Sequence, residues 1–340
     1  MSTSPGARHP LLIGENAARD DIAQAWEQDN QAWWDWYVSL AEPLPSYAPS
    51  PDTGVTDVPL PDDDAAVEGP STLAASLGRP YALSDQQVAA FRRDGYVKLP
   101  GVLTAGAAAT LRREMIRLLG DAFPADAEVT AESGRFRSLE LVWLQNALIR
   151  AFVLSPRIAG IASELLGVPA VRLYHDNLMN KEPGCGRTPW HHDDHHFPLA
   201  THDVVTAWIP AQAISRAMGP LAFAKPIDAW KLVRDVPFNK FDTSYDRRVG
   251  EVFREAGVEV DDSAFNLGEV SFHHNLSFHT AGANHTAHHR VVLANTYFAD
   301  GARVRDDPTM VSGDWRKFMP GVEPGQLATS ALNPVCWAPR

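Results

Sequence analysis

The sequence contains few cysteines, only Cys185 and Cys336 among 340 residues. Two cysteines so far apart exclude a disulfide framework and a C-x-x-C zinc site, and they fit a reducing environment, so we expect a cytoplasmic protein. The sequence also lacks any apolar run close to the roughly 20 residues that span a bilayer. Its first twenty residues do not show the basic and apolar pattern of a signal peptide. We therefore expect no membrane partner.

Basic residues are in the minority, with 30 Lys and Arg against 42 Asp and Glu and a net charge of −12. A negative protein repels phosphate groups, which excludes nucleic acid and anionic membranes as the main partner. Hydrophobic residues make up 45% and charged residues 21%, as is typical of a globular protein with a sizeable core. The expected partner is a small-molecule substrate, and the sequence leaves a homo-oligomer open.

The composition changes along the chain and predicts three parts. Residues 1–80 are expected to be an N-terminal extension, with an aromatic amphipathic helix over 15–42 and a Pro- and Asp-rich wrapping segment over 43–70. Residues 81–300 are expected to form the main domain, and residues 301–340 a tail packed on it.

Helix signals come first in the main domain and strand signals follow. Ser84 and Gln87 form a capping box for a helix that Gly95 ends, and Ser155-Pro156 opens a helix that Gly167 ends. After residue 169, segments rich in β-branched and aromatic residues alternate with Gly, Pro and Asn turns. This order predicts an α+β chain built on a β-sandwich or jelly roll, with strands in VRLYHDNLM, VVTAWIP, PLAFA, EVSFHH and RVVLANTYF.

Histidine is concentrated in two windows. Of the thirteen histidines, eleven fall within residues 191–202 and 273–289. The first window reads Pro-Trp-His-His-Asp-Asp-His-His from Pro189. In an extended segment, side chains two positions apart point to the same side, so His191 and Asp193 can reach one metal ion together. His192 and Asp194 fit the same template, and a zinc site or a solvated polar loop would also explain the pattern.

The second window can supply a third ligand. Two imidazoles and one carboxylate on one face of an octahedron are typical of non-haem iron(II), with three positions left for a 2-oxo acid and dioxygen. The window predicts a short strand ending at His279, a turn at residues 282–284 and a strand from Arg290. A buried Arg290 guanidinium would need an anion, for which the distal carboxylate of 2-oxoglutarate is suited. A surface ion pair is the other interpretation of Arg290.

Several motifs together resemble the phytanoyl-CoA dioxygenase family of Fe(II)- and 2-oxoglutarate-dependent oxygenases. The resemblance covers roughly residues 80–300 and includes the LSDQQVAAFRRDGYVKLPGVL element. Its other motifs are Trp190-His191-x-Asp193, the strand from Thr206 to Pro210, Gly219-Pro220-Leu221, and His279 followed eleven residues later by Arg290. The family often has Pro-Gly-Ser-His after Gly-Pro-Leu, whereas this chain has Ala224-Lys225-Pro226-Ile227, which leaves the substrate open.

The resemblance implies a double-stranded β-helix with helices packed on one sheet. It also implies that His191, Asp193 and His279 hold Fe(2+) and that Arg290 binds 2-oxoglutarate. In relatives, the strand positions that match Thr206 and Trp208 line the co-substrate pocket. With this assignment His192 points away from the metal, and the other histidines of the second window are structural or face the substrate.

The chemistry implied by the family couples decarboxylation of 2-oxoglutarate by O2 to oxidation of a substrate. Hydroxylation, desaturation, epimerisation and ring closure stay open, whereas halogenation is disfavoured because Asp193 is present. Polar residues near the motif, namely Tyr174, Asn177, Asp194, His195 and His196, favour a hydrophilic small molecule or secondary metabolite. Residues 238–248 are interpreted as a mobile loop that covers the site. The alternatives are a cupin-like metal-dependent isomerase or hydrolase and a non-catalytic jelly-roll protein that binds a metal or ligand. A 2-oxoglutarate oxygenase that acts on a protein or carrier-bound substrate also stays open.

Overall fold

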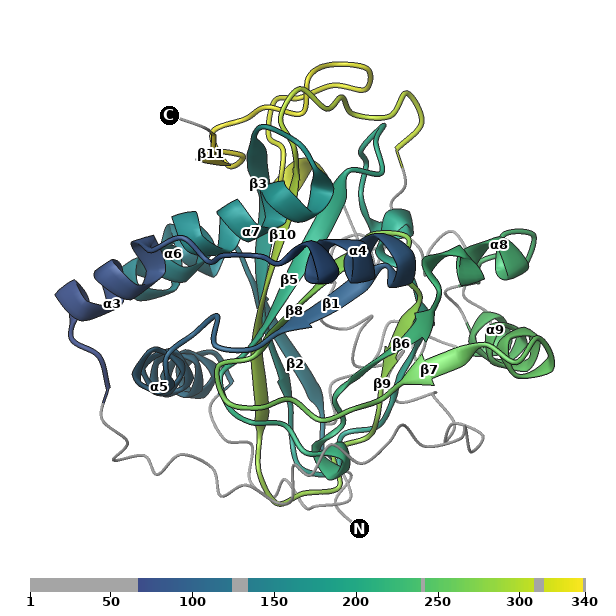
Figure 1. Ribbon diagram of the computed structural model, residues 1–340, viewed down its shortest axis with the longest axis horizontal. Helices are drawn as coiled ribbons and strands as arrows, with labels where there is room; N and C mark the ends of the chain where they lie inside the picture. Colours follow the sequence, from purple (N-terminus) through teal and green to yellow (C-terminus); the bar gives the residue numbers. More distant parts are fainter. Residues whose placement is uncertain (1–66, 124–133, 240–241, 309–314, 339–340) are drawn as a thin grey trace, which may run out of the picture.

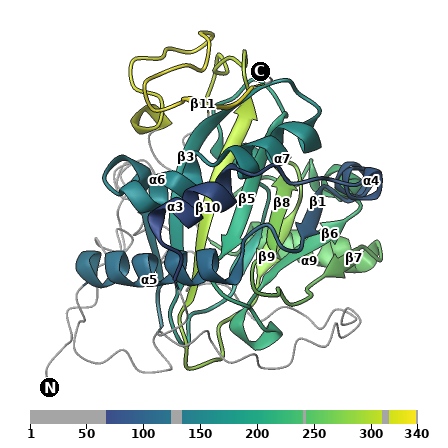
Figure 2. The same ribbon diagram turned by 60° about the vertical axis from the view of Figure 1, so that its left-hand side comes forward.

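The structure, a computed structural model, describes residues 67–123, 134–239, 242–308 and 315–338. Two antiparallel β-sheets face each other, and a layer of helices covers the outer face of the larger sheet (Figures 1 and 2). This arrangement is the double-stranded β-helix, or jelly roll, and it confirms the α+β class predicted from the sequence. The expected helix over residues 15–42 and most of the wrapping segment lie outside the described residues.

The larger sheet has seven strands, in the order β1-β8-β5-β10-β3-β11 with β2 also paired to β3. Its strands are β1 (Tyr96–Leu99), β2 (Phe136–Glu140), β3 (Val171–Lys181), β5 (Val204–Pro210), β8 (Val270–His274), β10 (Arg290–Ala299) and β11 (Val335–Trp337). The smaller sheet has the order β4-β9-β6-β7. Its strands are β4 (Thr188–His191), β6 (Leu221–Lys225), β7 (Glu259–Asp261) and β9 (His279–Ala281).

Most of the described helices precede β3, after which strands predominate, as the sequence predicts. They are α3 (Pro70–Gly78), α4 (Asp85–Asp94), α5 (Ala105–Ala122), α6 (Ala147–Val153), α7 (Pro156–Leu166), α8 (Trp230–Val233) and α9 (Ser244–Glu255). Single 3-10 turns are η2 (Val142–Leu144), η3 (Asp193–His196), η4 (Arg216–Met218), η5 (Ile227–Ala229) and η6 (Trp315–Lys317). No helix within these ranges is both long and apolar enough to cross a membrane.

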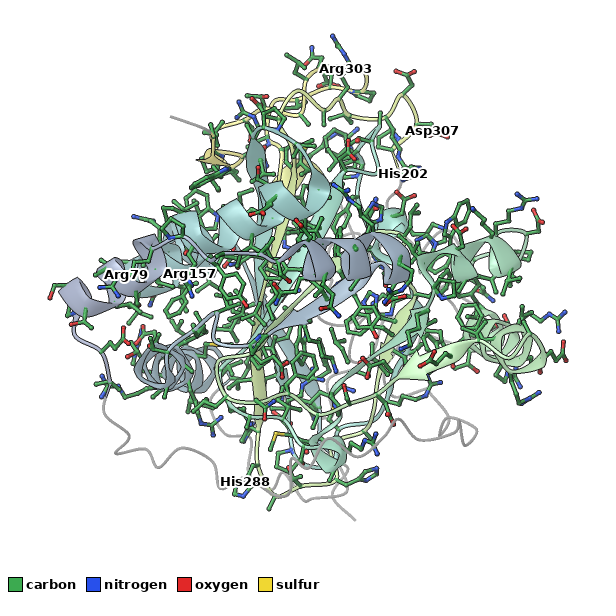
Figure 3. All side chains as sticks on the ribbon, in the orientation of Figure 1. Arg79, Arg157, His202, His288, Arg303 and Asp307 are labelled. Carbon is green, nitrogen blue, oxygen red and sulfur yellow. The ribbon has the colours of Figure 1, made fainter. Side chains whose placement is uncertain are left out.

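The predicted helix ends are confirmed in detail. Ser84 and Gln87 exchange hydrogen bonds as a capping box, and Gly95 takes the left-handed conformation that ends α4. Ser155 caps α7, and Gly167 ends it. Arg157 of α7 donates hydrogen bonds to the carbonyl oxygens of Arg79 and Val102, so α7 is tied to the segments that follow α3 and β1 (Figure 3).

Strand β10 shows why this sheet is stable. Val291 and Leu293 pack on the helices in the main core, whereas Val292 and Ala294 belong to a second apolar cluster between the two sheets. Every residue from Arg290 to Phe298 is buried, because each face of the strand meets another layer. Burial of one large aliphatic side chain contributes roughly 1.5–3 kcal/mol. The two-sided burial explains why the sequence of this strand is almost continuously apolar.

The described residues after Asp300, 301–308 and 315–338, include segments that lie against the jelly roll. Strand β11 pairs with β3, and Trp315, Phe318 and Met319 form an apolar cluster with Tyr174 and other side chains of the sandwich. The division of the chain at residues 80 and 300, with a tail packed on the domain, stays a prediction.

One buried carboxyl should make the stability of this fold depend on pH. Asp176 of β3 is fully buried, and its Oδ2 accepts a hydrogen bond from the Trp143 N–H at 3.1 Å. Burial raises the pKa of Asp176 from 3.8 to about 7. The unfolded chain therefore loses this proton at lower pH than the folded chain, so the contribution to stability is present below pH 4 and is lost as the pH rises towards 7.

We expect Asp176→Asn to remove this loss, because an amide is never ionised and its oxygen still accepts from Trp143. At pH 8 the variant should be more stable than the wild type by on the order of 2–4 kcal/mol, with little difference at pH 4. Urea unfolding across this pH range measures the effect. The control is Asp235→Asn, whose side chain is 92% exposed. An equal pH dependence of Asp176→Asn and wild type would contradict the prediction.

Candidate metal centre

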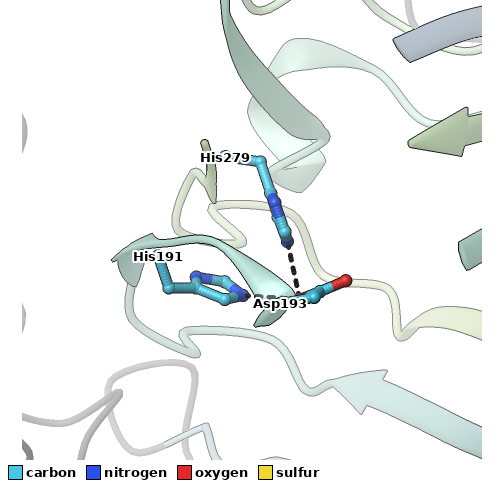
Figure 4. Close-up of side chains that lie close together, drawn as sticks. All are labelled: His191, Asp193 and His279. Atoms are coloured by element: carbon cyan, nitrogen blue, oxygen red, sulfur yellow. Dashed lines mark ion pairs between the residues drawn. The ribbon is translucent and has the colours of Figure 1, made fainter. Parts of the chain in front are cut away.

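Three candidate ligands come together between the sheets. His191 ends β4, His279 begins β9, and the two residues are directly opposite in the β4–β9 pair. Asp193 begins η3, and one ligand atom from each residue lies within 4.8 Å of the others. The Nε2 atoms of His191 and His279 lie 3.9 and 3.7 Å from the same Asp193 Oδ1 atom (Figure 4). This spacing leaves room for one metal ion at the centre of the three atoms.

Backbone carbonyl groups fix both imidazoles. Nδ1 of His191 lies 2.8 Å from the Pro189 carbonyl oxygen, and Nδ1 of His279 lies 3.0 Å from the Ser277 carbonyl oxygen. A carbonyl only accepts, so each Nδ1 carries the proton and each Nε2 presents its lone pair to the centre. The sequence predicted a strand that ends at His279. This was wrong, because residues 277–278 form the connection that orients the ring, and β9 starts at His279.

The structure also distinguishes between the two His-x-Asp registers. Asp194 points away from the centre, and its Oδ1 accepts hydrogen bonds from Asn275 at 2.9 Å and Arg305 at 2.8 Å. The His192 ring packs on His195 and Phe278, outside the cluster. The strand ends at His191, so Asp193 reaches the centre because η3 turns the chain there. The expectation of one extended segment through both residues was wrong in this respect.

Burial sets the protonation of the three groups. It lowers the pKa of His191 to about 3, with the nearby His279 ring adding to the effect, and it lowers the pKa of His279 to about 4. Burial alone would raise the pKa of Asp193, but the imidazoles around it and the hydrogen bond from His273 outweigh burial and hold this pKa well below its ordinary value. At neutral pH the cluster therefore offers two neutral imidazoles and a carboxylate, the forms that bind a cation.

The second oxygen of Asp193 is held by neighbours on the larger sheet. Asp193 Oδ2 accepts a hydrogen bond from Thr206 Oγ1 at 3.2 Å, and His273 Nε2 lies at 3.2 Å from the same oxygen. Thr206 and His273 are directly opposite across the β5–β8 pair. The sequence singled out Thr206 but gave His273 no specific role, since its contact depends on the strand register. The available sequence signal for a role of His273 was its place in a predicted strand, two residues after Ser271, so that both side chains lie on one face of that strand.

Arg290 lies at the other end of the same cavity. Its side chain is buried with 2% exposure, and the guanidinium carbon lies 5.4 Å from the centre of a Trp208 ring. Burial lowers the pKa of Arg290 to about 10. Nη1 donates to the Gly219 carbonyl oxygen at 2.7 Å, but Nε has no hydrogen-bond partner and no carboxylate within the described ranges pairs with this guanidinium. A buried cation in this state fits an anionic ligand.

Gly219 forms the support for Arg290. Its φ is +73°, and a Cβ atom there would lie 2.2 Å from the Gly282 carbonyl oxygen. The same Gly282 oxygen accepts a hydrogen bond at 2.6 Å from the buried ammonium of Lys181, which is opposite Arg290 in the β3–β10 pair. The Gly-Pro-Leu motif seen in the sequence thus marks a close contact of two backbone turns that only glycine permits.

One cavity joins the candidate metal centre to Arg290. Tyr174, Asn177 and His196 line it, as expected from the sequence, whereas Asp194 and His195 do not. The lining residues that the sequence missed include Phe136, Glu140 and Phe318.

Residues 238–248 are only partly the loop that the sequence predicted. Helix α9 starts at Ser244, and its buried face includes Tyr245, Val249 and Phe253, whose four-residue spacing is a helical signal. Asp246 on this helix forms a buried ion pair with Arg187 and accepts a hydrogen bond from the Trp190 N–H at 2.7 Å. The helix is therefore anchored to β4. Mobility of the cover stays a prediction.

Comparisons with known proteins show which family this chain resembles. A family model described as phytanoyl-CoA dioxygenase (PhyH) matches residues 91–292, more than half of the chain. The ectoine dioxygenase of Sphingopyxis alaskensis is 34% identical over 116 residues, which are 33% of this chain and 37% of that protein. The ectoine dioxygenase of Stutzerimonas stutzeri is 32% identical over 117 residues, 33% of this chain and 38% of that protein. The match thus spans well under half the length of these curated relatives.

Two solved structures share the fold over nearly their whole length. The non-heme, alpha-ketoglutarate-dependent carbocyclase SnoK from nogalamycin biosynthesis has a TM-score of 0.61 and 23% identity, and the match covers 76% of this chain and 99% of SnoK. The corresponding epimerase SnoN has a TM-score of 0.58 and 24% identity, with 79% of this chain and 100% of SnoN covered. At these identities the likeness shows the fold.

The different roles of Asp193 and Asp194 can be tested with Co2+ as a spectroscopic probe. We expect Asp193→Ala to weaken Co2+ binding at least about tenfold, because one of three protein ligands is removed. Asp194→Ala should keep wild-type Co2+ affinity but lose roughly 1–3 kcal/mol of stability, because Arg305 and Asn275 lose their acceptor. Absorption titration and urea unfolding measure the two effects. The reverse pattern would show that the metal is held by the other register.

Proposed function

Because this chain belongs to the phytanoyl-CoA dioxygenase family, we propose that it is an Fe(II)- and 2-oxoglutarate-dependent dioxygenase. Its substrate is a small molecule with polar groups, such as a secondary metabolite, and turnover releases succinate and CO2. One observation carries the proposal. The cluster of His191, Asp193 and His279 lines the same cavity as the buried guanidinium of Arg290.

The residues present fit iron(II). Two imidazole nitrogens and one carboxylate oxygen are the protein ligands of the 2-His-1-carboxylate group, which leaves three positions of an octahedron for other ligands. Iron(II) bound there would supply the activation of dioxygen and the coupled decarboxylation of 2-oxoglutarate. His191, Asp193 and His279 would hold the ion. His273 and Thr206 hold the second oxygen of Asp193 and so fix which oxygen faces the ion.

Arg290 supplies the recognition of 2-oxoglutarate. Its guanidinium would bind the distal carboxylate through charge-assisted hydrogen bonds, with Nε free to donate. Trp208 would form the wall beside this pair, since its ring already lies against the guanidinium. Arg290 and Trp208 are both buried, which keeps water from the pair of guanidinium and carboxylate. The attraction between these two charges is stronger without water.

The two other functions considered from the sequence leave Arg290 without a role. A cupin-like isomerase or hydrolase and a non-catalytic binding protein both require the metal ligands, but neither requires a buried cation without a carboxylate partner in the same cavity. Hydroxylation is the default outcome of the proposed chemistry. Ring closure and epimerisation occur on the same fold in SnoK and SnoN, whose names state these reactions.

The proposed function is tested by the conversion of labelled 2-oxoglutarate. Purified protein with Fe(II), ascorbate and oxygen should release labelled succinate and CO2, and the rate should rise when a substrate from a panel of polar metabolites is added. Protein with Zn2+ should release none. Substrate turnover with Zn2+ and no succinate would instead support the isomerase or hydrolase.

We expect Arg290→Ala to weaken 2-oxoglutarate binding at least about thirtyfold, since loss of one partner from a buried charged pair costs roughly 2 kcal/mol or more. Co2+ affinity should stay within about threefold, because Arg290 is not a candidate metal ligand. Titration of the metal-free variants with Co2+ measures the affinity for the metal, and calorimetric titration of the Co2+-loaded variants measures the affinity for 2-oxoglutarate. The control is Arg93→Ala, an arginine whose side chain is 67% exposed. Unchanged 2-oxoglutarate affinity in Arg290→Ala would exclude the guanidinium from the site.

A further inference from the structure

The outer part of the cavity has an acceptor pair that the proposed chemistry does not use. Glu140 of β2 and Asn177 of β3 are directly opposite in the β2–β3 pair, and both line the cavity. Directly opposite residues on one face have Cβ atoms roughly 4.5–5.5 Å apart. The Glu140 carboxylate and the Asn177 amide can therefore contact one group of a bound molecule together.

Both groups of this pair present hydrogen-bond acceptors. Asn177 is 9% exposed, and its buried Oδ1 has no hydrogen-bond partner among the described residues. An ionised carboxylate accepts and never donates. A buried acceptor that stays unsatisfied costs roughly 1–3 kcal/mol, so a ligand that donates to Asn177 recovers this free energy. The pair thus favours a group with several N–H or O–H donors.

The Glu140 carboxylate already accepts a hydrogen bond from a cationic donor of this chain. The ammonium of Lys317, in η6, lies 2.6 Å from Glu140 Oε2. The same ammonium lies 4.7 Å from the ring centre of Phe318, which lines the cavity. An ammonium between a carboxylate and an aromatic face is stabilised by both. Side-chain exposures of 36% for Lys317 and 17% for Glu140 place this pair at the mouth, where the lysine can leave for solvent.

The charges that line the cavity support the same conclusion. Its lining includes two carboxylates, Asp193 and Glu140, and one guanidinium, Arg290. Asp193 belongs to the candidate metal centre, and Arg290 is assigned to 2-oxoglutarate. Glu140 is the lining carboxylate that neither assignment uses, and its negative charge attracts a cation, as the pair with Lys317 shows. The stacked rings of Phe318 and His175, with centroids 4.5 Å apart, add an aromatic wall beside it.

We propose that the substrate carries an ammonium or amidinium group that binds between Glu140 and Asn177 and replaces the Lys317 ammonium on Glu140. This inference rests on the proposed function, because it takes the cavity beside the metal centre as the substrate site. Lys317 then occupies the cation subsite when no substrate is present. Glu140 and Phe318 determine specificity, and neither holds the metal or 2-oxoglutarate.

The test compares 2-phenylethylamine with 2-phenylethanol, two probes that differ in the charged group and share the ring. Calorimetric titration uses the protein loaded with Fe(II) and 2-oxoglutarate without oxygen, so no turnover occurs. We expect the amine to bind at least about tenfold more tightly than the alcohol, because its hydrogen bonds to the carboxylate are charge-assisted. Equal affinities of the two probes would overturn the proposal.

Two variants and a matched control test whether the preference for the amine depends on Glu140 and Lys317. Glu140→Gln should bind the amine no more tightly than the alcohol. Lys317→Met should bind the amine about threefold more tightly than the wild type, because the competing ammonium of a partly exposed ion pair is removed. Lys231→Met removes a lysine from another exposed ion pair and should leave both affinities unchanged. An amine preference that survives in Glu140→Gln, or unchanged amine affinity in Lys317→Met, would overturn the proposal.

The titration without metal separates this inference from the proposed function. Glu140 is not a candidate metal ligand, so the preference for the amine should persist in metal-free protein. If the chain keeps this preference but never releases succinate, only the proposed oxygenase function fails. If it releases succinate but binds both probes equally, only the cation subsite fails.

Discussion

The position of the candidate metal centre depends on a buried ion pair behind it. Arg187 and Asp246 pair at 7% and 3% side-chain exposure, and Asp246 also accepts a hydrogen bond from the Trp190 N–H, one residue before His191. Arg187 donates further to Thr280, the neighbour of His279. One network therefore holds both histidine strands and helix α9. Removal of one partner from a buried pair costs roughly 3–5 kcal/mol, because the other charge is left unpaired. The network thus favours one arrangement of β4 against β9.

Charged groups of opposite sign lie at different places along the cavity. The buried Arg290 stands at one end without a carboxylate partner, Asp193 lies at the candidate metal centre, and Glu140 lies near the mouth. Each charged group is oriented by contacts with the backbone or with neighbouring side chains. Arg290 donates to the Gly219 carbonyl group, and Asp193 accepts from Thr206. A ligand with charges in another order would place like charges together, which costs free energy in a buried site. In the proposed function, this order of charges selects both the ligands and their orientation.

Local signals predicted many of the elements and the ligand types, because capping, alternation and histidine spacing involve residues close in sequence. The capping box at Ser84 and the strand from Arg290 were predicted from such local signals. The resemblance to a family gave His191 with Asp193 over the neighbouring pair, and the structure shows the physical cause in the turn of η3. His273 and Glu140 were not predicted in their roles. Their contacts depend on the register of strands far apart in sequence, and a shift of one residue would turn each side chain to the other face.

The residues that follow the family match contribute contacts around the cavity that residues 91–292 do not supply. Arg305 binds Asp194, the neighbour of a candidate ligand, and Lys317 and Phe318 reach the mouth of the cavity beside Glu140. Strand β11 holds this region against β3. The matched residues 91–292 contain all the candidate ligands of the metal and of 2-oxoglutarate. The ion pair of Lys317 with Glu140 involves none of these ligands, whereas Arg305 reaches the neighbour of one of them. Selectivity for the substrate can therefore vary in this fold while the oxidative chemistry stays constant.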